Sequence, residues 1–142
     1  MAAQEDLDRA YLTMADTWSH LSKASRKRVG CLIVKDGQII SDGFNGTPTG
    51  FKNACEDEDG FTRKEVLHAE SNAITKLAKS TQSGDGATIY ITCSPCFECA
   101  KLIIQAGIKR VVYAERYRID CGLSLLRKAA IDIKRYSDLF SH

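Results

Sequence analysis

The sequence has no hydrophobic run that approaches the roughly 18 residues needed to cross a membrane. Its first residues are polar and acidic, which is unlike a secretory signal. Repeats, low-complexity tracts and linkers are lacking, and a net charge of +2 gives no global attraction to nucleic acid. The 142 residues, 44% of them hydrophobic, are expected to form one domain, 1–142, in the cytoplasm, or in the host cytoplasm of a viral protein.

Cysteine is the residue type whose distribution carries the most information. Three of the six cysteines, Cys93, Cys96 and Cys99, fall within one short segment. Because no export signal accompanies them, reduced thiols that bind a metal are favoured over disulfides.

Two short motifs together predict a catalytic zinc site. His68-Ala69-Glu70 is followed later in the chain by Pro95-Cys96-Phe97-Glu98-Cys99. One imidazole and two thiolates fill three corners of a tetrahedral zinc and leave the fourth open for water, as in catalytic sites. Glu70 is not needed as a ligand, so its carboxylate is available to carry protons.

The spacing of these residues places them at the starts of two helices. Cys96 and Cys99 lie three residues apart at a helix start, so both sulfurs project to one side, where the helix N-terminus favours thiolates. His68 and Glu70 would be roughly 200° apart in mid-helix. The set therefore works only if His68 stands at the first turn of its own helix, with both helix N-termini directed at one metal.

The motif also has plainer readings. A structural zinc usually has four protein ligands, and a fourth is not obvious here. Cys93 forms a second C-x-x-C pair with Cys96, but it ends the preceding strand and is interpreted as an unliganded neighbour. Cys31, Cys55 and Cys121 lack paired spacing and are expected to be core or surface thiols.

Hydrophobic periodicity predicts an α/β fold with a mixed central sheet. A favoured two-residue turn at Asp36-Gly37 joins the first two strands, and Pro95 is expected within the first turn of a helix that ends at Gly107. The predicted elements are helices at about 5–22, 68–79, 95–107 and 120–130, strands at 29–34, 38–41, 87–92, 108–114 and 131–135, and a loop at 43–63. This order indicates a three-layer α/β/α sandwich.

The chain resembles the cytidine and deoxycytidylate deaminase superfamily, and within it the dCMP deaminases. The resemblance rests on residues 68–74 and 94–101, the strand 29–34, the stretch 105–113 and the loop Gly43-Phe44-Asn45-Gly46-Thr47-Pro48-Thr49-Gly50. The GxNG element of that loop points to dCMP. The resemblance implies a cytidine-deaminase-like fold, one catalytic zinc held by His68, Cys96 and Cys99, and hydrolysis of dCMP to dUMP and ammonia for thymidylate synthesis. It also implies a homo-oligomer, a hexamer or dimer.

The resemblance assigns roles to further residues. Asn45 would bind the deoxyribose 3′-hydroxyl, and the backbone near Ala69 would read the pyrimidine, with Ser94 also at the substrate. Arg26 and Tyr117 would approach the 5′-phosphate. Each has a plainer alternative, because Asn45 starts an Asn-Gly pair typical of turns, Arg26 belongs to a basic stretch typical of solvated surface, and Tyr117 could be packing.

Some features depart from the family pattern. Phe44 replaces a common Tyr, and residues 51–67 hold Cys55 but no His, so no second zinc is expected. Some members of the family are activated by dCTP and inhibited by dTTP, and the acidic run 56–59 and Phe44 argue against the same regulation in this chain. Two rival functions stay open: a nucleoside, tRNA or nucleic-acid base deaminase, which would need a basic stacking surface, and a non-catalytic zinc-binding or thiol-redox module, which would not need Glu70.

Overall fold

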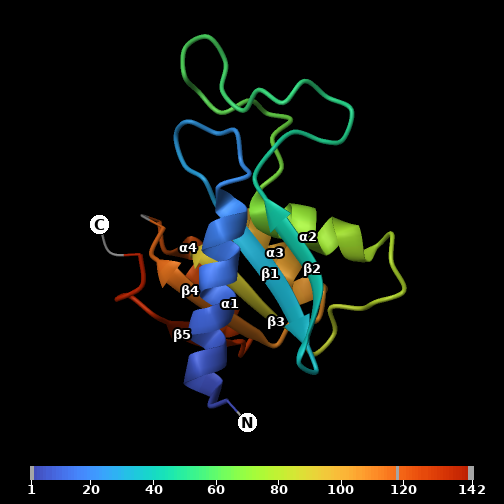
Figure 1. Cartoon of the computed structure of the whole chain (residues 1–142), viewed down its shortest axis with the longest axis vertical. Helices are drawn as coiled ribbons and strands as arrows, with labels where there is room; N and C mark the ends of the chain where they lie inside the picture. Colours follow the sequence, from blue (N-terminus) through green and yellow to red (C-terminus); the bar gives the residue numbers. More distant parts are fainter. Residues whose placement is uncertain (1, 118, 141–142) are drawn as a thin grey trace.

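A computed structural model describes residues 2–117 and 119–140, which form one mixed five-stranded sheet between helices (Figure 1). The elements are α1 Gln4–Ser19, β1 Gly30–Lys35, β2 Gln38–Phe44, α2 Ala69–Leu77, β3 Thr88–Cys93, α3 Phe97–Gln105, β4 Arg110–Glu115, α4 Cys121–Lys128 and β5 Asp132–Arg135. The strand order is β2-β1-β3-β4-β5. The predicted order of helices and strands is confirmed.

The sheet combines an antiparallel half with a parallel half. β1 pairs antiparallel with both β2 and β3, whereas β3, β4 and β5 are parallel. The predicted hairpin turn is present, with φ of 51° at Asp36 and 75° at Gly37, the left-handed values that a type I′ turn needs. Because parallel strands require crossovers, α3 and α4 connect β3 to β4 and β4 to β5.

The helices cover the two faces of the sheet unequally, which completes the predicted three layers. One face carries α1, whose Leu12 and Ala15 pack on side chains of β1, β3 and β4. The other face carries α2, α3 and α4, which bury the larger core cluster. In the described part of the chain, no helix combines the length and the apolar character that a membrane span requires.

Three of the differences from the predicted boundaries have local reasons. The first helix ends at Ser19, because the residues after it form tight turns and Ser22 Oγ donates to the Asn45 carbonyl. β2 continues to Phe44, where it still pairs with Gly30 of β1. Pro95 lies before α3 and not in its first turn, because Cys96 has an extended backbone (φ −71°, ψ 172°) and is the N-cap.

A buried carboxylate joins the first helix to the parallel half of the sheet. Asp8 is fully buried, and the Arg110 guanidinium donates to both of its oxygens at 2.8 Å. The hydroxyls of Tyr90 and Tyr136 donate to it at 2.8 and 2.7 Å, and Gln4 at 2.9 Å. Burial alone would raise the pKa of Asp8, but these donors hold it well below its ordinary range. Its contribution to stability is therefore present above about pH 4 and is lost as the pH falls further.

Replacing Asp8 with Asn should lower the free energy of unfolding by about 3 kcal/mol, because the amide leaves the Arg110 charge without its buried partner. Urea unfolding at neutral pH measures this change. The matched control is Asp132→Asn, since Asp132 also bonds Arg110, at 3.2 Å, but is 72% exposed. An exposed pair is worth about 0–1 kcal/mol, so equal losses in the two variants would contradict a special role for Asp8.

Candidate functional site

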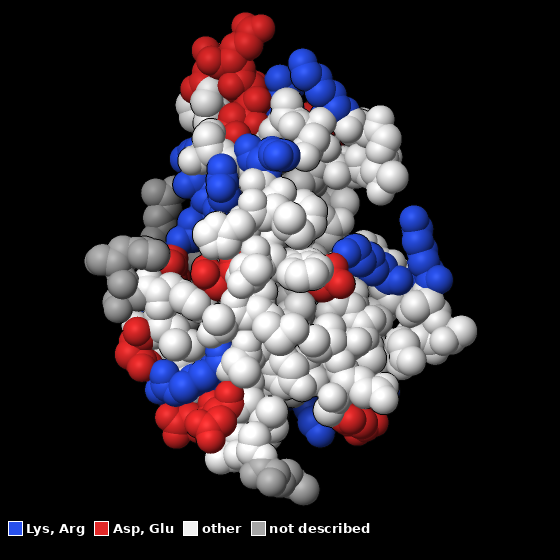
Figure 2. Space-filling view, in the orientation of Figure 1, with Lys and Arg blue, Asp and Glu red and all other residues white. Residues whose placement is uncertain are grey.

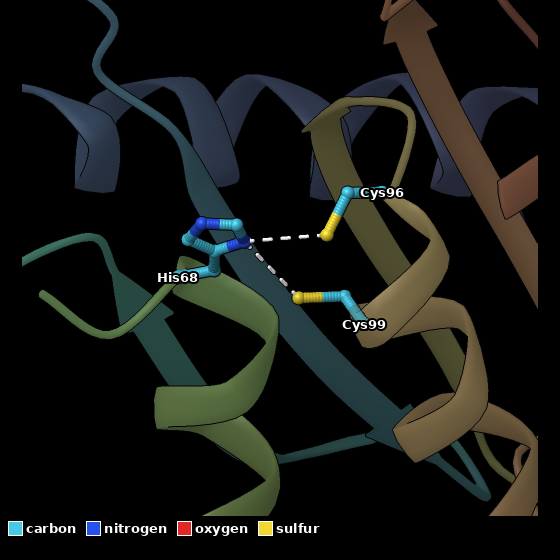
Figure 3. A group of neighbouring side chains, drawn as sticks. All are labelled: His68, Cys96 and Cys99. Carbon is cyan, nitrogen blue, oxygen red and sulfur yellow. Dashed lines mark hydrogen bonds between the residues drawn. The ribbon is translucent and has the colours of Figure 1, made fainter. Parts of the chain in front are cut away.

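The N-termini of α2 and α3 point toward one place, as the motif spacing predicted (Figure 3). His68 is the N-cap of α2 and Cys96 is the N-cap of α3, and both have extended backbone conformations. Cys99 lies in the first turn of α3, so its sulfur projects to the same side as that of Cys96. The three side chains thereby come from two elements that follow different strands.

The distances between the three donor atoms suit a tetrahedral metal ion. His68 Nδ1 lies 3.5 Å from Cys96 Sγ and 3.3 Å from Cys99 Sγ. All three donor atoms lie within 4.8 Å of one another. With zinc–nitrogen and zinc–sulfur bonds of about 2.0 and 2.3 Å, the nitrogen–sulfur edge of a tetrahedron is about 3.5 Å. His68, Cys96 and Cys99 can therefore hold zinc and leave one position open.

The charges of this group also call for a cation. Hydrogen bonding from Cys99, together with His68, lowers the pKa of Cys96 to about 4, so Cys96 is a thiolate at neutral pH. The neighbouring Cys96 sulfur and burial raise the pKa of Cys99 far above its ordinary value. Two adjacent thiolates repel each other, and a divalent cation between them removes that repulsion. The donor set thus fits zinc, which binds the thiolate form.

Glu70 is the carboxylate beside the metal-ligand group. It is only 4% exposed and lies one residue into α2, so its side chain is held by the helix start. Burial raises the pKa of Glu70, while its own backbone N–H and the nearby His68 act in the opposite direction. A raised pKa brings a carboxyl closer to the range in which it can both accept and donate a proton at neutral pH.

Two glycines allow the close packing that brings these helix starts together. A Cβ on Gly43 of β2 would lie 2.4 Å from the Ala69 carbonyl oxygen, at the start of α2. A Cβ on Gly122 of α4 would lie 2.1 Å from the Pro95 carbonyl oxygen, just before α3. Both distances are far below van der Waals contact, so each position requires glycine for the site to keep its shape.

A cavity of about 500 Å³ opens beside the metal-ligand group. Its walls include every residue predicted for the site except Cys99, which is buried behind Cys96: Arg26, Asn45, His68, Ala69, Glu70, Ser94, Cys96 and Tyr117. The segments 20–29 and 45–67, which contribute much of the wall, project together from the end of the sheet where β1 begins and β2 ends (Figure 1). Residues predicted from separate motifs therefore share one cavity.

Two of these residues also organise the cavity wall. The Asn45 carboxamide accepts the Val29 N–H at 2.9 Å and donates to the Lys27 carbonyl at 2.8 Å. Ser94 Oγ accepts the Tyr117 N–H at 2.6 Å and is itself buried. An amide and a hydroxyl have further hydrogen-bonding capacity, so these bonds leave room for a ligand contact.

The cavity also contains residues that the sequence analysis did not single out. Arg116 follows the carboxyl end of β4, where ligands bind in open α/β sheets, so its position next to Tyr117 was a usable signal. Glu56 carried no such signal, because it belongs to an acidic run that is typical of solvated surface. Cys93 lines the wall but lies outside the group of three metal donors, in keeping with its interpretation as an unliganded neighbour.

Comparison with known proteins agrees with this geometry. The family model described as the cytidine and deoxycytidylate deaminase zinc-binding region matches residues 5–115. The chain belongs to this family. The match includes both helix starts and the three residues that can hold the metal ion.

The relatives include several deoxycytidylate deaminases. The chain is 33% identical over 140 residues to that of Saccharomyces cerevisiae, covering 92% of this chain but 45% of the yeast protein. It is 35% identical to that of Enterobacteria phage T4, covering 82% of this chain and 79% of the phage protein. The dCMP deaminase of cyanophage S-TIM5, solved with dCMP and dUMP, superposes with a TM-score of 0.92 at 43% identity, covering 95% and 100%. This chain thus spans less than half of the yeast relative.

Proposed function

We propose that this protein is a zinc-dependent hydrolase that converts dCMP to dUMP and ammonia and so supplies dUMP for thymidylate synthesis. The observation that carries the proposal is one cavity whose wall holds Glu70, Arg26 and two of the three residues that can bind zinc, His68 and Cys96. The names of the yeast, T4 and S-TIM5 relatives support the same substrate. A cavity of about 500 Å³ has the size of a small-molecule site, so it suits a mononucleotide better than a polymer.

The chemistry follows from what each group can do. His68, Cys96 and Cys99 would hold zinc, which when bound would lower the pKa of a water molecule and so supply a nucleophile at neutral pH. Glu70, buried beside these residues, accepts the proton of the water and delivers a proton to ring nitrogen N3, which prepares C4 for attack. After addition at C4, the same carboxylate would take the remaining hydroxyl proton and pass it to the amine, which leaves as ammonia while the C4 carbonyl forms. One buried group with a raised pKa is suited to both transfers.

The remaining wall residues would bind the rest of the nucleotide. Asn45 would offer its free amide hydrogen or lone pair to the 3′-hydroxyl, and the Ala69 backbone, at a helix start with free N–H groups, would read the base. Ser94, which is buried in the cavity wall, would lie near the base, and Tyr117 and Arg26 would approach the 5′-phosphate. We also propose a cytoplasmic homo-oligomer, with dCTP and dTTP as candidate effectors.

Ammonia release tests this function directly. The zinc-loaded protein is incubated separately with dCMP, deoxycytidine, CMP, dCTP and a cytosine-containing single-stranded oligonucleotide. The expected result is a clear preference for dCMP. Preference for the oligonucleotide would identify a nucleic-acid deaminase, and a zinc-loaded, folded protein that releases no ammonia from any substrate would identify a non-catalytic module.

Replacing Arg26 with Ala should raise KM for dCMP by roughly ten- to a hundredfold, because a charge-assisted contact to the phosphate is worth ~1.5–3 kcal/mol. The weak activity on deoxycytidine should change little, since that substrate has no phosphate. Steady-state kinetics on both substrates measure the difference. The control is Lys23→Ala, which removes a charge from the same basic segment without reaching the cavity. A parallel decline on both substrates would show that Arg26 does not bind phosphate.

A further inference from the structure

The mouth of the cavity holds three cations, and carboxylates neutralise them. Lys27 pairs with Glu115, and Arg116 pairs with Asp120 through a bond of 2.8 Å from its Nε. The third cation, Arg26, lies beside Glu56, and the two charges interact. Each of the three cations that line the described part of the cavity therefore has a carboxylate beside it, although a monophosphate can still bond to the Arg26 guanidinium.

Glu56 is held at this mouth by the backbone of the opposite segment. Its carboxylate accepts the Ser25 N–H at 3.1 Å and the Arg26 N–H at 3.3 Å. The Ser25 N–H in particular lowers the pKa of Glu56, so the carboxylate is ionised at neutral pH. Two converging N–H groups are an arrangement that binds anions, and here the protein's own carboxylate fills it.

The surroundings show that Glu56 is unlike the acids next to it. Figure 2 shows acidic side chains gathered at the tip of the long loop, with basic side chains below them. Asp57, Glu58 and Asp59 of that tip are exposed and do not line the cavity, whereas Glu56 is half-buried in its wall. The Glu56 charge is thus fixed in the cavity wall beside Arg26, the residue proposed to bind the 5′-phosphate.

We propose that Glu56 restricts this pocket to nucleoside monophosphates, because its fixed carboxylate repels the additional phosphates of a di- or triphosphate. The inference rests on the proposed function, in which Arg26 binds the first phosphate. A triphosphate carries about two more negative charges than a monophosphate, and the cations that line the described part of the cavity, Arg26, Lys27 and Arg116, already have carboxylates beside them. At a separation of several ångströms in a partly solvated site, repulsion between the Glu56 carboxylate and the outer phosphates should lower the affinity for a triphosphate about tenfold relative to a monophosphate.

The test compares Glu56→Gln with wild type and with Glu58→Gln in the zinc-loaded full chain without added magnesium. The amide of the Glu56→Gln variant keeps an oxygen that can accept the two N–H groups but removes the charge. The Glu58 variant makes the same change two residues away, outside the cavity. Dissociation constants for dCMP and dCTP are measured by calorimetry, and kcat/KM for both by ammonia release. Each comparison is repeated near 1 M salt, where the Debye length is about 3 Å.

The expected result is that Glu56→Gln raises the dCTP-to-dCMP ratio about tenfold at low salt, that high salt removes much of this gain, and that Glu58→Gln changes the ratio by less than about twofold. An unchanged ratio, an equal rise in the Glu58 variant, or an equal loss for both nucleotides would overturn the proposal. Because the calorimetric ratio does not need turnover, it still decides the role of Glu56 if the wild type fails to release ammonia, a result that would refute only the proposed function.

Discussion

Replacing Glu70 with Gln is expected to lower kcat for dCMP by about 10²–10⁴-fold while zinc content and folding stay intact. The amide matches the buried carboxylate in shape, and its oxygen can still accept a hydrogen bond from the backbone N–H of residue 70. It cannot take a proton from water and return it to N3 and to the leaving amine. KM should change less than kcat, because the lost interaction belongs to the transition state.

The measurement combines steady-state kinetics with metal analysis of the same preparation. Glu98→Gln is the matched control, since Glu98 lies between the two cysteine ligands but is exposed and pairs with Lys101 outside the cavity. That variant should keep the wild-type kcat. If the Glu70 variant retained a substantial share of the wild-type kcat, another group would have to carry the protons.

Replacing Cys99 with Ala is expected to abolish stoichiometric zinc binding and, with it, the part of the stability that depends on the metal. Two donors, His68 and Cys96, cannot complete the site, and metal-binding energy is coupled to folding. In the wild type, a chelator should lower Tm, because zinc stabilises the state that binds it. In the variant, Tm should be low with or without the chelator. Metal analysis and thermal unfolding measure the two effects.

Two other cysteine variants make this result specific. Cys121→Ala alters an exposed thiol on α4 that is not a metal donor, and it should keep one zinc per chain. Cys93→Ala should also keep one zinc, because the Cys93 sulfur lies outside the group of three side chains that can hold a metal ion. Full zinc occupancy without Cys99, or loss of zinc without Cys93, would show that the ligand set is different. A stoichiometry near two would show a second site.

Much of the fold could be predicted because its signals are local. The Asp36-Gly37 turn needs left-handed backbone at two successive positions, and Gly107 (φ 82°) ends α3 for a similar reason. Alternating and 3.6-residue patterns identified every strand and helix, and the alternation of parallel strands with helices requires a layered sheet. Boundaries were less predictable, because β2 reaches Phe44 only through pairing with β1, which lies in another part of the chain.

The metal site was predictable for a related reason. If two donors from one helix start and one donor from another bind the same zinc ion, the two helix starts must lie together. The chemistry of zinc therefore implies a long-range contact, which the spacing of the residues alone does not imply. The Asp8 network had no such signal. A single aspartate in an acidic, apparently solvated helix start gives no indication that it is buried against Arg110, Tyr90 and Tyr136.

The sequence by itself determined the family, the zinc donors His68, Cys96 and Cys99, and the layered α/β order, because each depends on residue types at fixed spacing. Only the tertiary structure decided what stands around the metal. In the folded chain, Arg26 and Glu56 come from separate loops and line one cavity. The Asn45 side chain joins those loops through its hydrogen bonds to the backbone of residues 27 and 29. Charge balance and burial arise from residues distant in the chain, so they are fixed by packing and not by any local pattern.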